Sequence, residues 1–254
     1  MRMPALGSPK ERVELALDIG SLVLGLLFSS THALFGAYPL SVALISVLPG
    51  RVWYAVIGSV LGALTLGKSG LIYGMIYVVL AFLRIIASSP EAPRESTEGE
   101  KRRRILPAVP GGESIMLRVS VSVIGGFIAS VYELLLGGFT ENTLLFSVAM
   151  LLLPPIGVLL LAGLFDPALE LTSVFGKGGD AVAALSRTGA YFKLSFLSLA
   201  FLLSLSMSPY SVLGVSFAYV LAGVLALWSA YALGPIAGCA VGFAAALGHS
   251  GTSW

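Results

Sequence analysis

The sequence predicts an all-α protein built as a polytopic membrane helix bundle of about nine spans, within a range of eight to ten. Hydrophobic residues occupy 57% of the 254 positions and charged residues only 11%, whereas soluble domains carry roughly 25% charged residues. The mean hydropathy is +0.94. Apolar runs at 71–86, 143–164 and 192–228 are long enough to cross about 30 Å of hydrocarbon as helices. Lipid is therefore the expected solvent and partner.

Charge and cysteine content exclude several other classes of protein. A net charge of +2 is too small for a nucleic-acid-binding protein. Cys239 is the single cysteine, so the chain can form neither an internal disulfide nor a thiolate metal site. No acid stands at zinc-ligand spacing from His32 or His249, the only histidines. We therefore expect no metal, no cofactor and no catalytic residue in this chain.

Residues 1–87 form the first predicted group of transmembrane helices, at 13–30, 39–48, 52–66 and 71–87. Pro39 suits the first turn of a helix, and Pro49-Gly50 and Lys68-Ser69-Gly70 are helix breakers. Residues 88–113 then predict a solvated linker that contains Lys101-Arg102-Arg103-Arg104. The positive-inside rule places this linker in the cytoplasm, and four crossings place the N-terminus of this multi-pass membrane protein there too.

Residues 114–165 predict a transmembrane helix pair, at 115–136 and 144–164. Pro154 and Pro155 lie in the second of these helices and remove two backbone donors, so we expect a kink or break unless neighbours satisfy the freed carbonyls. Residues 166–191 predict a polar cytoplasmic segment with a short interfacial helix.

Residues 192–254 predict the C-terminal transmembrane helices, at 192–207, 212–230 and 235–247. An odd ninth crossing would leave Trp254 outside the cell.

Two predicted helices carry a stripe of polar and small side chains at steps of three and four residues. The stripe of helix 13–30 includes Asp18, and that of helix 115–136 includes Arg118 and Glu133. A charged acid at the bilayer centre costs at least about 2.5 kcal/mol, so each acid should be paired, protonated or near an interface. The stripes indicate either an ion or proton pathway or a structural contact such as Asp18 with Arg118. We expect the two helices to pack through these stripes.

Small residues recur every four positions in two further helices. Gly234, Gly238 and Gly242 form one such repeat, and Gly58 and Gly62 form a shorter one. This spacing lets membrane helices approach closely. We expect helix packing at these glycines, with self-association of the chain as a further use of them.

Several segments along nearly the whole chain resemble the membrane-spanning region of the stage II sporulation protein E family, a serine phosphatase family. They are Phe35-Gly36-Ala37-Tyr38-Pro39-Leu40, Leu48-Pro49-Gly50-Arg51, the runs 58–67 and 73–84, Ser208-Pro209-Tyr210, and Leu233-Gly234-Pro235-Ile236-Ala237-Gly238. The resemblance implies about ten spans, then a cytoplasmic segment that engages division proteins, then a metal-dependent protein serine/threonine phosphatase domain. The metal-binding aspartates of that domain have no counterpart here.

The resemblance therefore implies a multi-pass anchor and localisation region that clusters a cytoplasmic phosphatase at the division septum. The alternative is a small-solute transporter or its substrate-binding membrane subunit, because Tyr38-Pro39 and Pro209-Tyr210 interrupt corresponding parts of the two halves. A membrane-embedded enzyme lacks any convergent cluster of His, Asp or Glu in the sequence. The coding sequence after Trp254 separates the anchor from the transporter.

Overall fold

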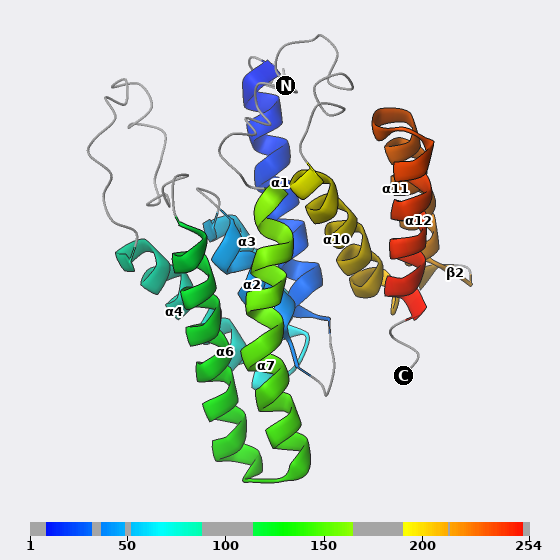
Figure 1. Cartoon of the computed structure of the whole chain (residues 1–254). Helices are drawn as coiled ribbons and strands as arrows, with labels where there is room; N and C mark the ends of the chain where they lie inside the picture. The colour runs from blue at the N-terminus through cyan, green and yellow to red at the C-terminus, as the bar shows by residue number, and fades with distance from the viewer. Residues whose placement is uncertain are drawn as a thin grey trace, which may run out of the picture. The chain divides into compact units, whose positions relative to one another are not determined.

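The computed structural model describes residues 9–31, 37–48, 52–87, 114–164, 190–212 and 214–250. These residues are helical apart from one two-stranded hairpin, so the predicted all-α class is confirmed (Figure 1). The chain divides into two compact units, one of residues 21–167 and one of residues 1–20 and 168–254. Residues 21–87 of the predicted first helix group thus share one unit with the predicted helix pair.

The first unit contains six α-helices and a short 3₁₀ turn in its described residues. They are α1 (Pro9–Ser29), whose first residues belong to the other unit, α2 (Pro39–Val47), α3 (Val52–Leu64), α4 (Lys68–Ala87), α6 (Ile115–Gly137), α7 (Glu141–Leu161) and η2 (Ala162–Leu164). The second unit contains α10 (Ala190–Met207), β1 (Ser211–Val212), β2 (Val215–Ser216), α11 (Phe217–Leu233) and α12 (Pro235–Ser250).

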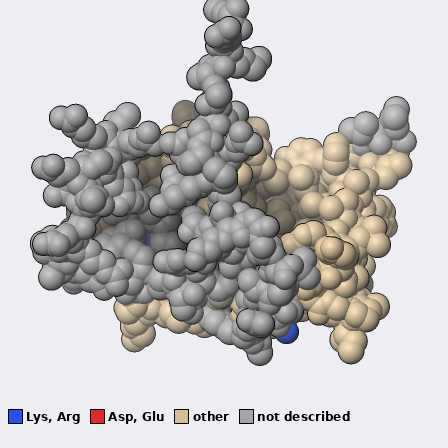
Figure 2. Space-filling model, turned by 90° about the horizontal axis from the view of Figure 1, so that it is seen from above, with Lys and Arg blue, Asp and Glu red and all other residues tan. Residues whose placement is uncertain are grey.

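Three helical stretches among the described residues are long and apolar enough to cross a membrane: Gly70–Ala87, Ile115–Gly137 and Glu141–Leu164. Five further apolar helices are shorter, at 10–17 residues. Membrane association is therefore supported by the structure, and the finer count of about nine spans stays a prediction. On the one face that Figure 2 shows, the described residues that can be seen are almost all uncharged.

The short helix α2 occupies the core of the first unit. All nine of its residues are buried, and it packs against α3, α4, α6 and α7. Nine residues span only about 13.5 Å, which is less than half of the hydrocarbon thickness. Helix α2 is therefore an enclosed half-length helix and cannot cross the membrane by itself.

Helices α1 and α3 meet through glycines. A Cβ on Gly58 would overlap the carbonyl oxygen of Leu22, and a Cβ on Gly25 would overlap that of Ala55. The glycine hydrogens point at these oxygens instead, which is the close backbone approach that small residues permit between membrane helices. Gly62 is equally close to Leu26. These contacts fix α1 to α3 backbone against backbone.

Helix α7 passes through Pro154 and Pro155 without interruption, so the structure shows no break there. Pro154 has no N–H to give the carbonyl of Met150, four residues earlier. Gly126 of the neighbouring helix α6 lies directly against that carbonyl oxygen. Helices α6 and α7 form one long antiparallel hairpin (Figure 1), and this glycine contact partly compensates for the missing donor.

Two predicted helix starts are wrong by about one turn. The expected breaker Lys68-Ser69-Gly70 lies inside α4, and the chain turns at Gly67, whose φ is 73°. Helix α7 begins at Glu141 because Thr140 caps it, accepting a hydrogen bond from the backbone N–H of Thr143 at 3.3 Å.

The predicted helix 212–230 is wrong at its start, because Ser211–Val212 and Val215–Ser216 form an antiparallel hairpin. Gly214 in the turn has a φ of 80°, which glycine adopts without steric cost. Ser216 then caps α11, accepting from the N–H of Ala218 at 3.2 Å. The helix therefore begins five residues later than predicted and continues to Leu233.

Within the second unit, α12 packs against α11 and α10. A Cβ on Gly238 would lie 2.5 Å from that of Ala230, and a Cβ on Gly248 would overlap the carbonyl oxygen of Phe201. The predicted linker 88–113 lies outside the described residues, and so do residues 166–189 of the predicted polar segment 166–191.

Candidate functional site

The two ends of α2 meet the two strongest polar features of the first unit. At its C-terminal end, Arg84 of α4 donates a hydrogen bond at 2.5 Å to the carbonyl oxygen of Ile45. The side chain of Arg84 is fully buried. The last carbonyls of a helix lack intrahelical partners and carry the negative end of the helix dipole, so a cation is stabilising here.

At the N-terminal end of α2, three tyrosines and a carboxylate come together from three parts of the chain. Tyr73 of α4 donates a hydrogen bond to Oε1 of Glu133 on α6 at 3.0 Å. The ring of Tyr73 meets Tyr38, the residue before α2, edge to face with centroids 5.1 Å apart. It meets Tyr132 with centroids 6.3 Å apart. We call these four residues, Tyr38, Tyr73, Tyr132 and Glu133, the tyrosine–glutamate cluster.

One residue of the tyrosine–glutamate cluster is enclosed, and the other three are more exposed. Tyr73 is 1% exposed, whereas Tyr38, Tyr132 and Glu133 are half-buried. Burial, and then the nearby Glu133 carboxylate, raise the pKa of Tyr38, so the phenol stays protonated at neutral pH. The cluster therefore joins the side chain of Glu133 to one enclosed and two half-buried tyrosines.

A second polar group lies beside the cluster, on the first turn of α2. Ser59 of α3 donates a hydrogen bond to Oγ of Ser41 at 3.3 Å. The hydroxyl of Tyr77 on α4 is enclosed next to Ser41 and has no hydrogen bond of regular geometry among the described residues. Polar side chains of α2, α3, α4 and α6 therefore converge at this end of the core.

The structure brings the predicted stripe residues to different neighbours. Glu133 accepts a hydrogen bond from Tyr73 of α4, Gly25 of α1 contacts α3, and Gly126 of α6 contacts α7. These contacts lie with other helices, and the expectation that the two stripes pack on each other stays a prediction. Arg118 is buried in α6, and Asp18 is half-buried in α1. Their pairing stays a prediction, since they belong to different units.

The predicted packing glycines have distinct surroundings. Gly58 and Gly62 lie against α1, and Gly238 and Gly242 lie against α11. Gly234 differs, since it lies between α11 and α12, where a Cβ would meet nothing within 4 Å. Its φ of 99° and ψ of 164° make it a turn residue instead of a helix contact.

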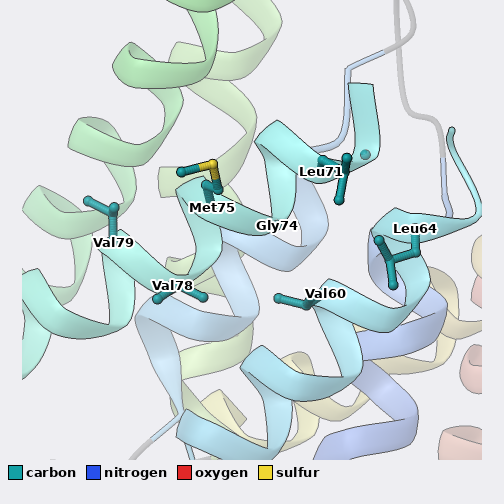
Figure 3. A pocket seen from close by; sticks show the side chains of 8 residues that line it. Val60, Leu64, Leu71, Gly74, Met75, Val78 and Val79 are labelled. Atoms are coloured by element: carbon teal, nitrogen blue, oxygen red, sulfur yellow. The ribbon is translucent and has the colours of Figure 1, made fainter. Parts of the chain in front are cut away.

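An apolar groove of about 350 Å³ runs between α3 and α4 (Figure 3). Gly70 lies against the backbone of Ala63, so the two helices meet closely at one end of the groove. Val60 of α3 and Met75 of α4 are both among its lining residues. Because its eight lining residues are all apolar or glycine, the groove offers no group that could orient a polar substrate, and it fits lipid contact.

Sequence reasoning missed Arg84 and the tyrosines of the tyrosine–glutamate cluster as a set. The described residues hold no group of three or more His, Cys, Asp or Glu that could bind a metal. A search of family models, of curated proteins and of solved structures finds no match for this chain. Function must therefore be argued from the sequence and from the geometry of the α2 core.

Proposed function

We propose that this chain is the membrane anchor and localisation region of a sporulation protein phosphatase similar to stage II sporulation protein E. It would hold a cytoplasmic phosphatase at the membrane and cluster it at the division septum. The observation that carries the proposal is that residues behind the sequence resemblance are contacts of the first unit's core.

Pro39, Gly58 and Arg84 illustrate this observation. Pro39 is the first residue of the enclosed helix α2, and Gly58 lets α3 pack closely against α1. Arg84 donates a hydrogen bond to the C-terminal end of α2. None of these contacts performs chemistry. A motif whose residues build a packed core supports a scaffold role more than an enzymatic one.

The anchor proposal is tested by localisation in a spore-forming bacterium. A fluorescent protein fused to the N-terminus should concentrate at the division septum. A phosphatase domain attached to the same chain should then concentrate there as well. The Gly20→Ala variant, at a position with open space around it, serves as the control for a harmless substitution and should localise like the wild type. Uniform fluorescence over the whole membrane would reject the localisation role.

A transporter is the second candidate, and the enclosed helix α2 favours it. Half-length helices in the core of membrane proteins commonly place their ends at ion and substrate sites. Here the ends of α2 lie beside Arg84 and the tyrosine–glutamate cluster. Solute-dependent currents from proteoliposomes on a solid-supported membrane would support transport, and their absence would leave the anchor as the stronger proposal.

A further inference from the structure

We propose that the groove between α3 and α4 binds one acyl chain of a membrane phospholipid. The inference goes beyond the anchor proposal, because it assigns a lipid ligand to the chain and holds for an anchor and a transporter alike. It rests on the apolar lining of the groove, on its volume and on its length along α4 (Figure 3).

The lining of the groove selects an apolar ligand. It consists of Val60 and Leu64 of α3 and of six residues of α4 between Gly70 and Val79, all of them apolar or glycine. Leu64 and Met75 are exposed, so the walls of the groove are open to the medium around the first unit. That medium is hydrocarbon, since the stretch Gly70–Ala87 is long and apolar enough to cross a membrane. A lipid tail therefore meets this groove directly.

The volume of the groove suits an acyl chain and is too small for a helix. The groove encloses about 350 Å³. A methylene group takes up about as much room as a water molecule, roughly 30 Å³, so about twelve carbons fill the groove. A single helical turn, about 10 Å across and 5.4 Å high, needs roughly 420 Å³. A helix of a partner protein therefore cannot enter the groove, whereas one acyl chain can.

The length of the groove matches one leaflet of the bilayer. Its lining on α4 runs over nine residues from Gly70 to Val79, a rise of about 13.5 Å and close to half of the roughly 30 Å of hydrocarbon. Gly70 is also the first residue of the candidate membrane span, next to the α3–α4 turn. The groove thus extends from one membrane surface to about the middle of the bilayer, as an acyl chain does. With the Arg-rich linker at the other end of α4 in the cytoplasm, this leaflet is the outer one.

Gly74 provides the space into which the chain packs. It is buried, and the nearest atoms to a Cβ built there belong to the side chain of Val60, at 3.5–4.0 Å. An empty groove leaves its lining without contact atoms on one side, so an acyl chain that fills the groove gains dispersion contacts. Because no backbone lies against Gly74, a larger side chain at this position can occupy the groove in place of the lipid.

The test maps lipid contacts of the full chain in phosphatidylcholine nanodiscs that contain a phosphatidylcholine with a diazirine on one acyl chain. Light removes N₂ from the diazirine, and the resulting carbene inserts into a neighbouring C–H bond, which mass spectrometry locates. Leu64 and Leu61 are both 48% exposed and lie three residues apart on α3, but only Leu64 is among the lining residues. The cross-link yield should be at least about threefold higher at Leu64, a preference that a handful of additional carbon–carbon contacts produces.

Gly74→Leu should lower this ratio to about one, because its side chain fills the groove. Gly223→Leu is the matched control, since Gly223 is a helical glycine of α11 with open space around it, and the ratio should not change. Each variant is first checked for a monodisperse elution profile. Val60→Phe fills the groove from α3 and keeps the test decisive if Gly74→Leu does not fold.

Three outcomes overturn the proposal. Equal yields at Leu64 and Leu61 in the wild type would mean that the groove holds lipid no better than the surface beside it. A lower yield at Leu64 would mean that protein, such as a second copy of the chain, covers the groove. A ratio that neither filling variant lowers would place the bound chain somewhere other than in the groove.

Discussion

Gly126 of α6 lies against the carbonyl oxygen of Met150 in α7, at the point where Pro154 has removed that carbonyl's helical partner. Gly126 and Pro154 are 28 positions apart in the sequence, yet the contact of Gly126 is with the carbonyl that Pro154 leaves without its helical donor. The proline leaves an acceptor open inside an apolar environment, and the absent side chain lets a neighbouring backbone approach it.

Gly126→Ala should therefore destabilise the α6–α7 hairpin. The added methyl group would overlap the Met150 carbonyl oxygen, and overpacking of this kind costs about 1–3 kcal/mol. Thermal unfolding of the purified chain in detergent, followed by circular dichroism, measures the loss. Gly20→Ala is the control, because a Cβ there meets nothing within 4 Å. An unchanged midpoint for Gly126→Ala would contradict the contact.

Arg84→Met should destabilise the core around α2. The substitution keeps an apolar stem but leaves the carbonyl of Ile45 without its charged donor, and losing a hydrogen bond to a charged group costs about 1.5–3 kcal/mol. Arg84→Lys should restore only part of the loss, because an ammonium lacks the planar fork of the guanidinium. The free energy of unfolding is again the measurement.

Lys193→Met serves as the control for Arg84→Met, because Lys193 is exposed on α10. It should change the unfolding free energy by no more than about 0.5 kcal/mol. Equal losses for the two substitutions would mean that Arg84 acts through net charge and not through its contact with α2.

Much of the helical order could be predicted from the sequence. Apolar length and the punctuation by proline and glycine placed α2, α6 and α10 within two residues of their observed bounds. The hairpin at 211–216 was missed because its valines and leucine continue an apolar run, and periodicity cannot separate a short strand from a helix within such a run.

The α2 core was harder to predict, because its contacts join distant residues. Arg84 and Ile45 are 39 positions apart, and Tyr73 and Glu133 are 60 apart. The helical spacing identified Glu133 as a residue in need of a partner, but it could not say which helix would provide one. The choice depends on how α4 and α6 pack around α2, which is a tertiary property.

Gly234→Ala should destabilise the α11–α12 connection through the backbone alone. The φ of 99° and ψ of 164° belong to a region that is essentially restricted to glycine and costs other residues about 1–3 kcal/mol. Asparagine should be no better tolerated, in contrast to a left-handed helical position. Gly223→Ala, with open space within α11, is the control and should be neutral or slightly stabilising in the same unfolding assay.

The orientation of the bundle is tested last, by labelling of introduced cysteines in intact cells. In a Cys239→Ala background, cysteines at Ser96 and Gly178 should resist an impermeant thiol reagent, because the basic run at 101–104 opposes translocation of its linker and two crossings return the chain to the same side. A cysteine at Phe139, 84% exposed in the α6–α7 loop, should react, since one crossing separates it from that linker. Permeabilised cells provide the control in which all three sites react. Labelling of Ser96→Cys from outside, together with protection of Phe139→Cys, would invert the orientation and place the tyrosine–glutamate cluster on the cytoplasmic side.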